Sequence, residues 1–204
     1  MKKIMLIILC LGLAALLLGA GVLYKNLSEQ VQIGGLVTQP PTETIPAETA
    51  EATEEAMGEA TEEVSYAAPD FTMLDWEGNE RKLSEFVGKP VILNFWASWC
   101  GPCKSEMPDL EAAFEKYGED IHFIMLNVTG GRETVESAKA FIEEAGYSFP
   151  VYFDINGEAS YYYGASSIPM TFFIDANGDL VTYGMGALSA EILEKGIGYI
   201  YTEE

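Results

Sequence analysis

One segment near the middle of the chain restricts the possible folds more than any other. Residues 90–96 form a nearly continuous apolar run of strand length, which is typical of a central strand buried on both faces. Apolar residues then recur at helical spacing until Gly118, which is placed to end the helix: Leu110, Ala113, Phe114 and Tyr117. A buried strand that leads into a helix predicts an α/β domain.

The same alternation continues along the chain. Residues 121–128 have the composition of a second strand, and residues 133–145 show the apolar spacing of a second helix, which Gly146 closes. Strand, helix, strand and helix at this spacing predict a parallel pair of strands with crossover connections.

Two hairpins and a last helix complete the predicted domain. Residues 71–74 and 81–83 flank an acidic turn, and residues 171–174 and 180–183 surround an Asn-Gly pair, which is a strong hairpin signal. Ser189 fits the N-cap of a helix that should bury four residues: Ile192, Leu193, Ile197 and Ile200. The pattern predicts a mixed sheet with helices on both faces.

Two of the three cysteines lie together at the start of the first helix, in the run Trp99-Cys100-Gly101-Pro102-Cys103. Backbone N–H groups and the helix dipole stabilise a thiolate there, so the spacing favours a redox pair. In that pair Cys100 would attack, and Cys103, one turn further in, would resolve the mixed disulfide. The alternative is a fixed structural disulfide, although so small a loop constrains the unfolded chain little.

A metal site has few ligands to draw on. The third cysteine, Cys10, falls in the apolar N-terminal run. The single histidine, His122, falls in a strand-like run, where it is more typical of a strand residue than of a ligand. Because a structural zinc site needs four such ligands, we predict no metal site.

The chain carries a formal net charge of −21, with 11 Lys and Arg against 32 Asp and Glu. Nucleic-acid binding depends on clustered basic residues that displace counterions from phosphates, so DNA and RNA are excluded as partners. The charge is also unevenly spread. Nine glutamates and no basic residue lie between residues 26 and 68, and the chain from Pro69 onward carries 8 basic and 23 acidic residues.

Residues 1–24 are predicted to be a transmembrane helix. The uncharged run 4–24 would form a helix of about 31 Å, which is enough to cross a hydrocarbon core of about 30 Å. Lys2 and Lys3 favour an N-terminus that stays in the cytoplasm. The alternative is a signal peptide cleaved near Gly19-Ala20-Gly21, after which the protein would be secreted. Both readings place the rest of the chain outside the cytoplasm.

Residues 25–66 have the composition of a linker. They are rich in Pro, Thr, Glu and Ala and contain few large apolar residues to bury, which predicts a disordered acidic spacer without a specific partner. Residues 67–204 would then form the folded domain.

Four motifs of this domain occur together. They are Ala68-Pro69-Asp70-Phe71, Leu83-Ser84-Glu85-Phe86-Val87-Gly88-Lys89, Leu93-Asn94-Phe95-Trp96-Ala97-Ser98-Trp99-Cys100-Gly101-Pro102-Cys103 and Ser167-Ile168-Pro169-Met170-Thr171-Phe172-Phe173-Ile174-Asp175. In combination they resemble the TlpA/ResA family of membrane-tethered, thioredoxin-like thiol-disulfide oxidoreductases. The resemblance covers about residues 67–202. It implies a thioredoxin-like fold with an N-terminal β-hairpin and an inserted segment after the second helix.

The resemblance also implies which residues bind the substrate. Ile168 and Pro169 would form a cis-proline loop beside the cysteines, with the backbone of Ile168 offered to a client chain as an extra strand. Trp99, Gly101 and Pro102 would complete the substrate-binding surface.

A further implied residue concerns proton transfer. Asn94 stands where cytosolic thioredoxins carry a buried Asp, and Glu106, three residues after Cys103, matches a Glu of the family. Our hypothesis is that Glu106 helps to deprotonate Cys103. The alternative is an exposed acid that is favourable near a helix N-terminus.

The implied activity is extracytoplasmic reduction of protein disulfides, with no cofactor besides the disulfide between Cys100 and Cys103. Apocytochrome c is a client of the family, and a membrane thiol transporter of the CcdA/DsbD type is the implied electron donor.

Two other functions receive less support. A peroxiredoxin-like peroxidase would carry Thr or Ser three residues before its cysteine and Pro seven before, where this chain has Ala97 and Leu93. The other is a non-enzymatic metallochaperone or assembly factor, and copper carriers of this fold would have a Cys-x-x-x-Cys spacing and a distal histidine, which this chain lacks.

Residues 161–163 are three consecutive tyrosines. They suggest either packing of a short helix or an aromatic rim for the substrate, and we favour packing.

Overall fold

The computed structural model describes residues 36–37 and 66–202. Within these residues, eight strands form one sheet in the order β1-β8-β7-β4-β5-β6-β2-β3. The strands are β1 (Leu36–Val37), β2 (Thr72–Leu74), β3 (Glu80–Lys82), β4 (Val91–Trp96), β5 (His122–Asn127), β6 (Val151–Phe153), β7 (Met170–Ile174) and β8 (Leu180–Met185). The helices are the 3-10 helix η1 (Leu83–Phe86), α2 (Gly101–Tyr117), α3 (Val135–Ala145), α4 (Glu158–Tyr162) and α5 (Ala190–Ile200).

The centre of the sheet is parallel, as the sequence predicts. Strand β4 pairs parallel with β5, and β5 pairs parallel with β6, whereas β4 pairs antiparallel with β7 on its other side. All six residues of β4 are buried, which confirms the prediction of a central strand covered on both faces.

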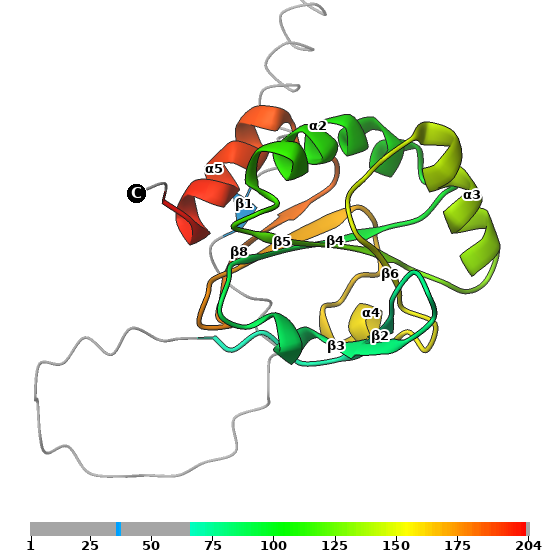
Figure 1. The fold of residues 1–204 in the computed structure, drawn as a ribbon, viewed down its shortest axis with the longest axis horizontal. Coiled ribbons are helices and arrows are strands. Elements are labelled where there is room, and N and C mark those ends of the chain that lie inside the picture. Colours follow the sequence, from blue (N-terminus) through cyan, green and yellow to red (C-terminus); the bar gives the residue numbers. More distant parts are fainter. Residues whose placement is uncertain (1–35, 38–65, 203–204) are drawn as a thin grey trace, which may run out of the picture. The chain divides into compact units, whose positions relative to one another are not determined.

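Each face of the sheet has its own apolar core. Figure 1 shows α2, α3 and α5 over one face, and the β2–β3 hairpin with α4 over the other. Because both crossovers run in the same direction along the sheet, the right-handed rule puts α2 and α3 on the same side. The predicted mixed sheet with helices on both faces is therefore confirmed, and so is the N-terminal hairpin.

Helix ends are set by local hydrogen bonds. Thr134 caps α3 by accepting from the backbone N–H of Ser137, and Gly146 ends it with a left-handed φ of 75°. The predicted start of this helix at residue 133 is two residues early, because Glu133 instead forms an isolated bridge with Gly130. Ser189 caps α5, as predicted.

Two short elements have little sequence signal of their own, and only the three tyrosines 161–163 suggested a short helix. Strand β6 and helix α4 make up the inserted segment that the family resemblance implies. Neither is long enough to show a periodic apolar pattern.

The predicted spacer 25–66 requires a correction. Leu36 and Val37 form β1, which pairs antiparallel with residues 183–184 of β8 and adds an eighth strand to the sheet. Tyr66 accepts a backbone hydrogen bond from Leu180 of the same strand. The open backbone groups of the β8 edge explain this pairing, since such an edge recruits any suitable extended segment.

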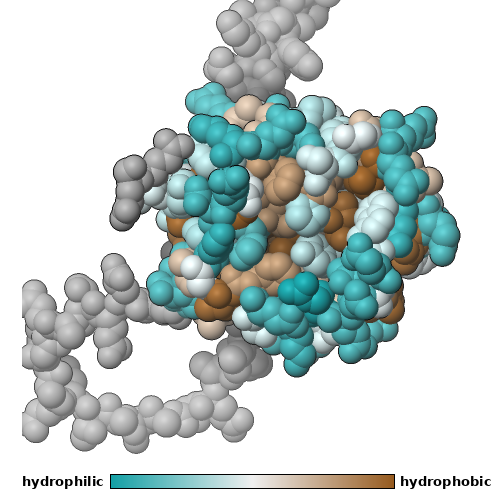
Figure 2. Space-filling view, viewed as in Figure 1, coloured by the Kyte–Doolittle hydropathy of each residue, from teal (hydrophilic) through white to brown (hydrophobic). Residues whose placement is uncertain are grey.

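The predicted membrane anchor, residues 1–24, lies outside the described residues. None of the helices in 66–202 is long and apolar enough to cross a bilayer. In the space-filling view the face turned to the reader is hydrophilic around its rim, and hydrophobic residues gather between the helices above and the hairpin below (Figure 2).

Candidate active site

The two cysteines form a disulfide at the start of α2. The S–S distance is 2.04 Å, and Cys100 is the N-cap residue of the helix. Its Sγ atom accepts a hydrogen bond from the backbone N–H of Cys103 at 3.2 Å. Pro102 occupies the first turn of the helix, where a backbone N–H would have no acceptor within the helix, so proline costs no hydrogen bond there. The first cysteine therefore lies where backbone donors stabilise negative charge on sulfur.

The surroundings of the disulfide differ on its two sides. Cys103, which belongs to α2 itself, is completely buried, and Cys100 is 4% exposed and lies between the exposed residues Trp99 and Gly101. The Trp99 side chain is 45% exposed although it is a large indole. Pro102 is exposed as well. Cys100 is thus the more exposed of the two cysteines, and exposed residues lie next to both in the chain.

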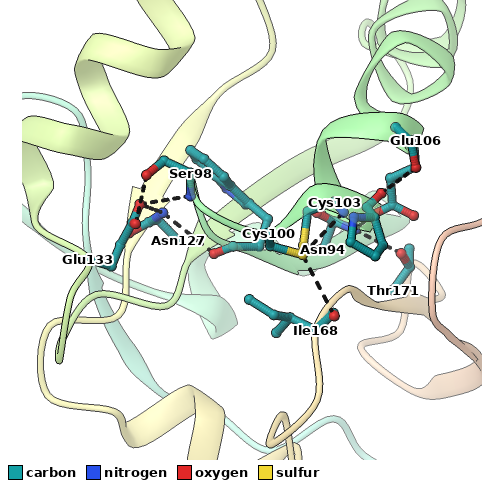
Figure 3. Close-up of a disulfide and its surroundings, with 12 residues drawn as sticks. Asn94, Ser98, Cys100, Cys103, Glu106, Asn127, Glu133, Ile168 and Thr171 are labelled. Carbon is teal, nitrogen blue, oxygen red and sulfur yellow. Dashed lines mark hydrogen bonds between the residues drawn. A yellow bond between two sulfur atoms is a disulfide. The ribbon is translucent and has the colours of Figure 1, made fainter.

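A proline loop lies against the first cysteine. The Ile168–Pro169 peptide bond is cis, and the Ile168 carbonyl oxygen lies 3.7 Å from Sγ of Cys100 (Figure 3). The Pro169 carbonyl accepts a hydrogen bond from the backbone N–H of Gly186, which ties this loop to the end of β8. All the residues expected to bind the substrate are therefore adjacent in sequence or space to Cys100.

Glu106 lies in a buried polar pocket. It is 2% exposed and accepts hydrogen bonds from Nδ2 of Asn94 at 2.8 Å and from the backbone N–H of Leu188 at 2.9 Å. Burial raises the pKa of its carboxyl group to about 7, although both hydrogen bonds oppose the rise. The alternative of an exposed acid at the helix N-terminus is therefore wrong.

Asn94 connects this pocket to the neighbouring strand. Its Nδ2 also donates to Oγ1 of Thr171 at 2.9 Å, and its Oδ1 has no hydrogen-bond partner among the described residues. An asparagine at this position cannot exchange a proton, so Glu106 is the titratable group of the pocket.

A second buried carboxylate near the cysteines was missed in the sequence. Glu133 is 2% exposed and accepts from the backbone N–H and the hydroxyl of Ser98 at 2.9 and 2.8 Å, and from Nδ2 of Asn127 at 2.9 Å (Figure 3). Helical spacing placed Glu133 at the start of the second helix without a role, and no short motif links it to Ser98 or Asn127. Only the parallel pairing of β4 and β5 brings the ends of these strands together.

The remaining candidates are structural. Tyr163 is buried and donates its hydroxyl to the Pro69 carbonyl, which confirms packing for this tyrosine, whereas Tyr161 and Tyr162 are exposed. His122 is half-buried at the start of β5, as expected of a strand residue, and its ring is nearly perpendicular to that of Phe86. Burial and, less strongly, Lys89 lower the pKa of its imidazole. Within 66–202, no three His, Cys, Asp or Glu side chains are grouped as a metal site requires.

A disulfide that caps a helix, against a cis-proline loop of a mixed sheet, defines a thioredoxin-fold thiol-disulfide oxidoreductase. Residues 64–183 match the model of the AhpC/TSA family. The chain belongs to this family and is a ResA-like member of it.

Similar proteins agree with this assignment. The chain is 36% identical to the thiol-disulfide oxidoreductase ResA of Geobacillus kaustophilus over 135 residues, which are 65% of this chain and 75% of ResA. It is 37% identical to ResA of Oceanobacillus iheyensis over 142 residues, which are 67% and 71% of the two chains. Among solved structures, a putative thiol:disulfide interchange protein DsbE from Chlorobium tepidum matches with a TM-score of 0.58 and 32% identity, over 65% of this chain and 94% of that one. The predicted thioredoxin-like fold is thus confirmed.

Proposed function

We propose that this protein reduces disulfides of client proteins outside the cytoplasm. The observation that carries the proposal is the disulfide of Cys100 and Cys103 at the N-terminus of α2, in which Cys100 is the N-cap residue and the more exposed of the two cysteines. The names of similar proteins support it, since they include thiol-disulfide oxidoreductases and a surface-exposed lipoprotein thioredoxin from Streptococcus pneumoniae.

The reaction begins with the reduced cysteine pair. The Cys100 thiolate attacks one sulfur of the client disulfide, which forms a mixed disulfide and releases the other client sulfur as a thiolate. Cys103 then attacks Cys100, so the Cys100–Cys103 disulfide forms and the second client sulfur leaves. Two electrons pass from the protein to the client, and two protons complete the client thiols. The N–H of Cys103 and the α2 dipole stabilise the attacking thiolate.

Glu106 is proposed to accept the proton of Cys103. A carboxyl with a pKa of about 7 is partly ionised at neutral pH, so it can take up a proton and return it in each cycle. Glu106 lies one turn after Cys103 on the same face of α2, and both side chains are buried. Asn94 and the Leu188 N–H hold the carboxylate in place.

The client chain would lie along the exposed residues around Cys100. Trp99, Gly101 and Pro102 form one side of this surface, and the loop of Ile168 and Pro169 forms the other. The backbone of Ile168 would pair with the client as an added strand, which is a common mode of peptide recognition.

Residues 1–24 would hold the domain at the outer face of the cell membrane, or would be removed if they act as a signal peptide. Outside the cytoplasm there is no soluble thioredoxin system, so a membrane thiol transporter of the CcdA/DsbD type would return the electrons. Apocytochrome c, whose haem-binding thiols must be reduced, is one client that fits.

The test is disulfide reduction by the purified full-length chain, with insulin as the substrate. We expect activity in the parent protein and none in Cys100→Ser. Cys103→Ser should instead accumulate as a mixed disulfide on Cys100, since the resolving thiol is absent. Activity that survives in Cys100→Ser, or a trap that forms equally well on Cys103 in that variant, would contradict the proposal.

A further inference from the structure

A cation lies at the exposed edge of the redox site. The guanidinium carbon of Arg132 is 3.9 Å from the centre of the Trp99 ring, and Trp99 directly precedes Cys100. A guanidinium that stacks on an indole uses one planar face and keeps its N–H edge for another partner. Among the described residues Arg132 is exposed and forms no salt bridge, so this edge is available to a bound molecule.

The backbone holds Arg132 in a tight turn. Gly130 and Glu133 exchange two backbone hydrogen bonds of 3.0 Å each, which closes a turn with Gly131 and Arg132 at its tip. Gly131 has a φ of 60°, a backbone conformation that is unfavourable for residues with a side chain. The position of Arg132 on the loop is therefore specified by the turn and is not left to a long flexible connection.

Glu133 ties this turn to the cysteine loop. Its buried carboxylate accepts both hydrogen bonds from Ser98, the residue before Trp99, and a third from Asn127 at the end of β5. Charged acceptors with several donors make strong hydrogen bonds, and a buried one is costly to leave unpaired. One carboxylate thus fixes the two loops that carry Arg132 and Trp99.

The charge at this position is opposite to that of the domain as a whole. From Pro69 onward acidic residues outnumber basic ones by 23 to 8, so the long-range field repels anionic clients. At the Trp99 surface the exposed Arg132 instead places a cation over the indole ring. A guanidinium edge pairs best with a carboxylate, to which it can donate two parallel hydrogen bonds.

We propose that Arg132 is a specificity-determining residue that binds an Asp or Glu side chain next to the client disulfide. Trp99 would contact the adjacent client backbone, and Glu133 is a positioning residue that keeps the two side chains stacked. The inference rests on the proposed function, because it concerns the clients of the same cysteine pair.

The experiment uses two cyclic disulfide peptides that differ only in Asp or Asn next to one cysteine. The rate of exchange with the full-length chain is measured in both directions, with reduced protein on the disulfide form and oxidised protein on the dithiol form. We expect the parent protein to prefer the Asp peptide about tenfold in kcat/KM, mainly through KM. In Arg132→Gln the preference should fall to about one.

Lys104→Gln is the matched control. Lys104 is also an exposed cation stacked on an aromatic ring, that of Phe141, so this variant removes the same charge near the same helix end. We expect it to keep the preference within about twofold, whereas Glu133→Gln should reduce it by raising KM for the Asp peptide. An unchanged preference in Arg132→Gln, or an equal loss in Lys104→Gln, would overturn the proposal. If neither peptide reacts in either direction, the result contradicts the proposed function as well as the role of Arg132.

Discussion

At the scale of the residue, the two buried carboxylates near the cysteines are equally buried but accept different numbers of hydrogen bonds. Glu133 receives three hydrogen bonds from Ser98 and Asn127, whereas Glu106 receives two, and burial dominates its pKa. The hypothesis for Glu106 came from the family resemblance, which has a Glu at this place three residues after Cys103. The importance of Glu133 could not be predicted, because its partners come from the ends of two strands whose pairing no local pattern specifies.

The raised pKa of Glu106 makes stability depend on pH. The folded protein holds this proton up to about pH 7, whereas the unfolded chain loses it near 4.5. The contribution of the protonated Glu106 to the free energy of unfolding is therefore fully present below pH 4.5. It decreases by up to about 3 kcal/mol as the pH rises through 7. In Glu106→Gln this loss should be absent, so the variant gains relative to the parent between pH 5 and 8. Denaturant unfolding of both oxidised proteins measures the difference, and parallel pH curves would contradict the assignment.

At the scale of the element, close packing of α5 on the sheet depends on a helical glycine. A Cβ atom on Gly196 would lie 2.3 Å from the Phe173 ring of β7, so the helix can approach the strand only without a side chain there. Amphipathic spacing predicted the helix and the burial of Leu193, Ile197 and Ile200 correctly, although Ile192 is only partly buried. It could not distinguish Gly196 from Gly198, which faces open space. Spacing gives the direction of a side chain and not the distance to its neighbour.

The two glycines give a matched pair of variants. Gly196→Ala should destabilise the protein by about 1–3 kcal/mol, because the Phe173 ring or the helix must move. Gly198→Ala should stabilise it by about 0.5–1 kcal/mol, since alanine favours a helix more than glycine does. Chemical denaturation of the oxidised proteins measures both, and equal effects of the two substitutions would show that α5 is less closely packed than described.

At the scale of the whole molecule, the net charge of −21 is divided among regions with different roles. If residues 1–24 form a membrane anchor, the basic residues near the N-terminus would set its orientation and the glutamates between 26 and 68 would belong to the proposed linker, while the remaining acidic excess lies in the chain from Pro69 onward. The fold of this part of the chain could be predicted because strand, helix and cysteine patterns agree. The inserted segment β6–α4 followed mainly from the family resemblance, since its elements are too short to carry a periodic pattern and only the tyrosines 161–163 suggested a short helix.

The acidic excess predicts a salt effect on client choice. Raising the ionic strength from 0.01 to 0.15 M shortens the Debye length from about 30 to about 8 Å and weakens long-range repulsion. We expect reduction of a strongly acidic client protein to speed up several-fold, while a client of near-zero net charge changes little. Stopped-flow measurement of both reactions tests this, and equal salt dependence would assign the charge to solubility alone.

The pairing of β1 with β8 changes how far the domain could extend from a membrane. Both Leu36–Val37 and Tyr66 bond to β8, so only the residues before Leu36 could add to the distance between a membrane and the sheet. If residues 1–24 span the bilayer, only residues 25–35 would separate the membrane from the sheet. Their mean end-to-end distance as a random coil would be roughly 18 Å, compared with roughly 35 Å for residues 25–66. The redox site would then serve clients close to the lipid surface, where a membrane-embedded electron donor can also meet it.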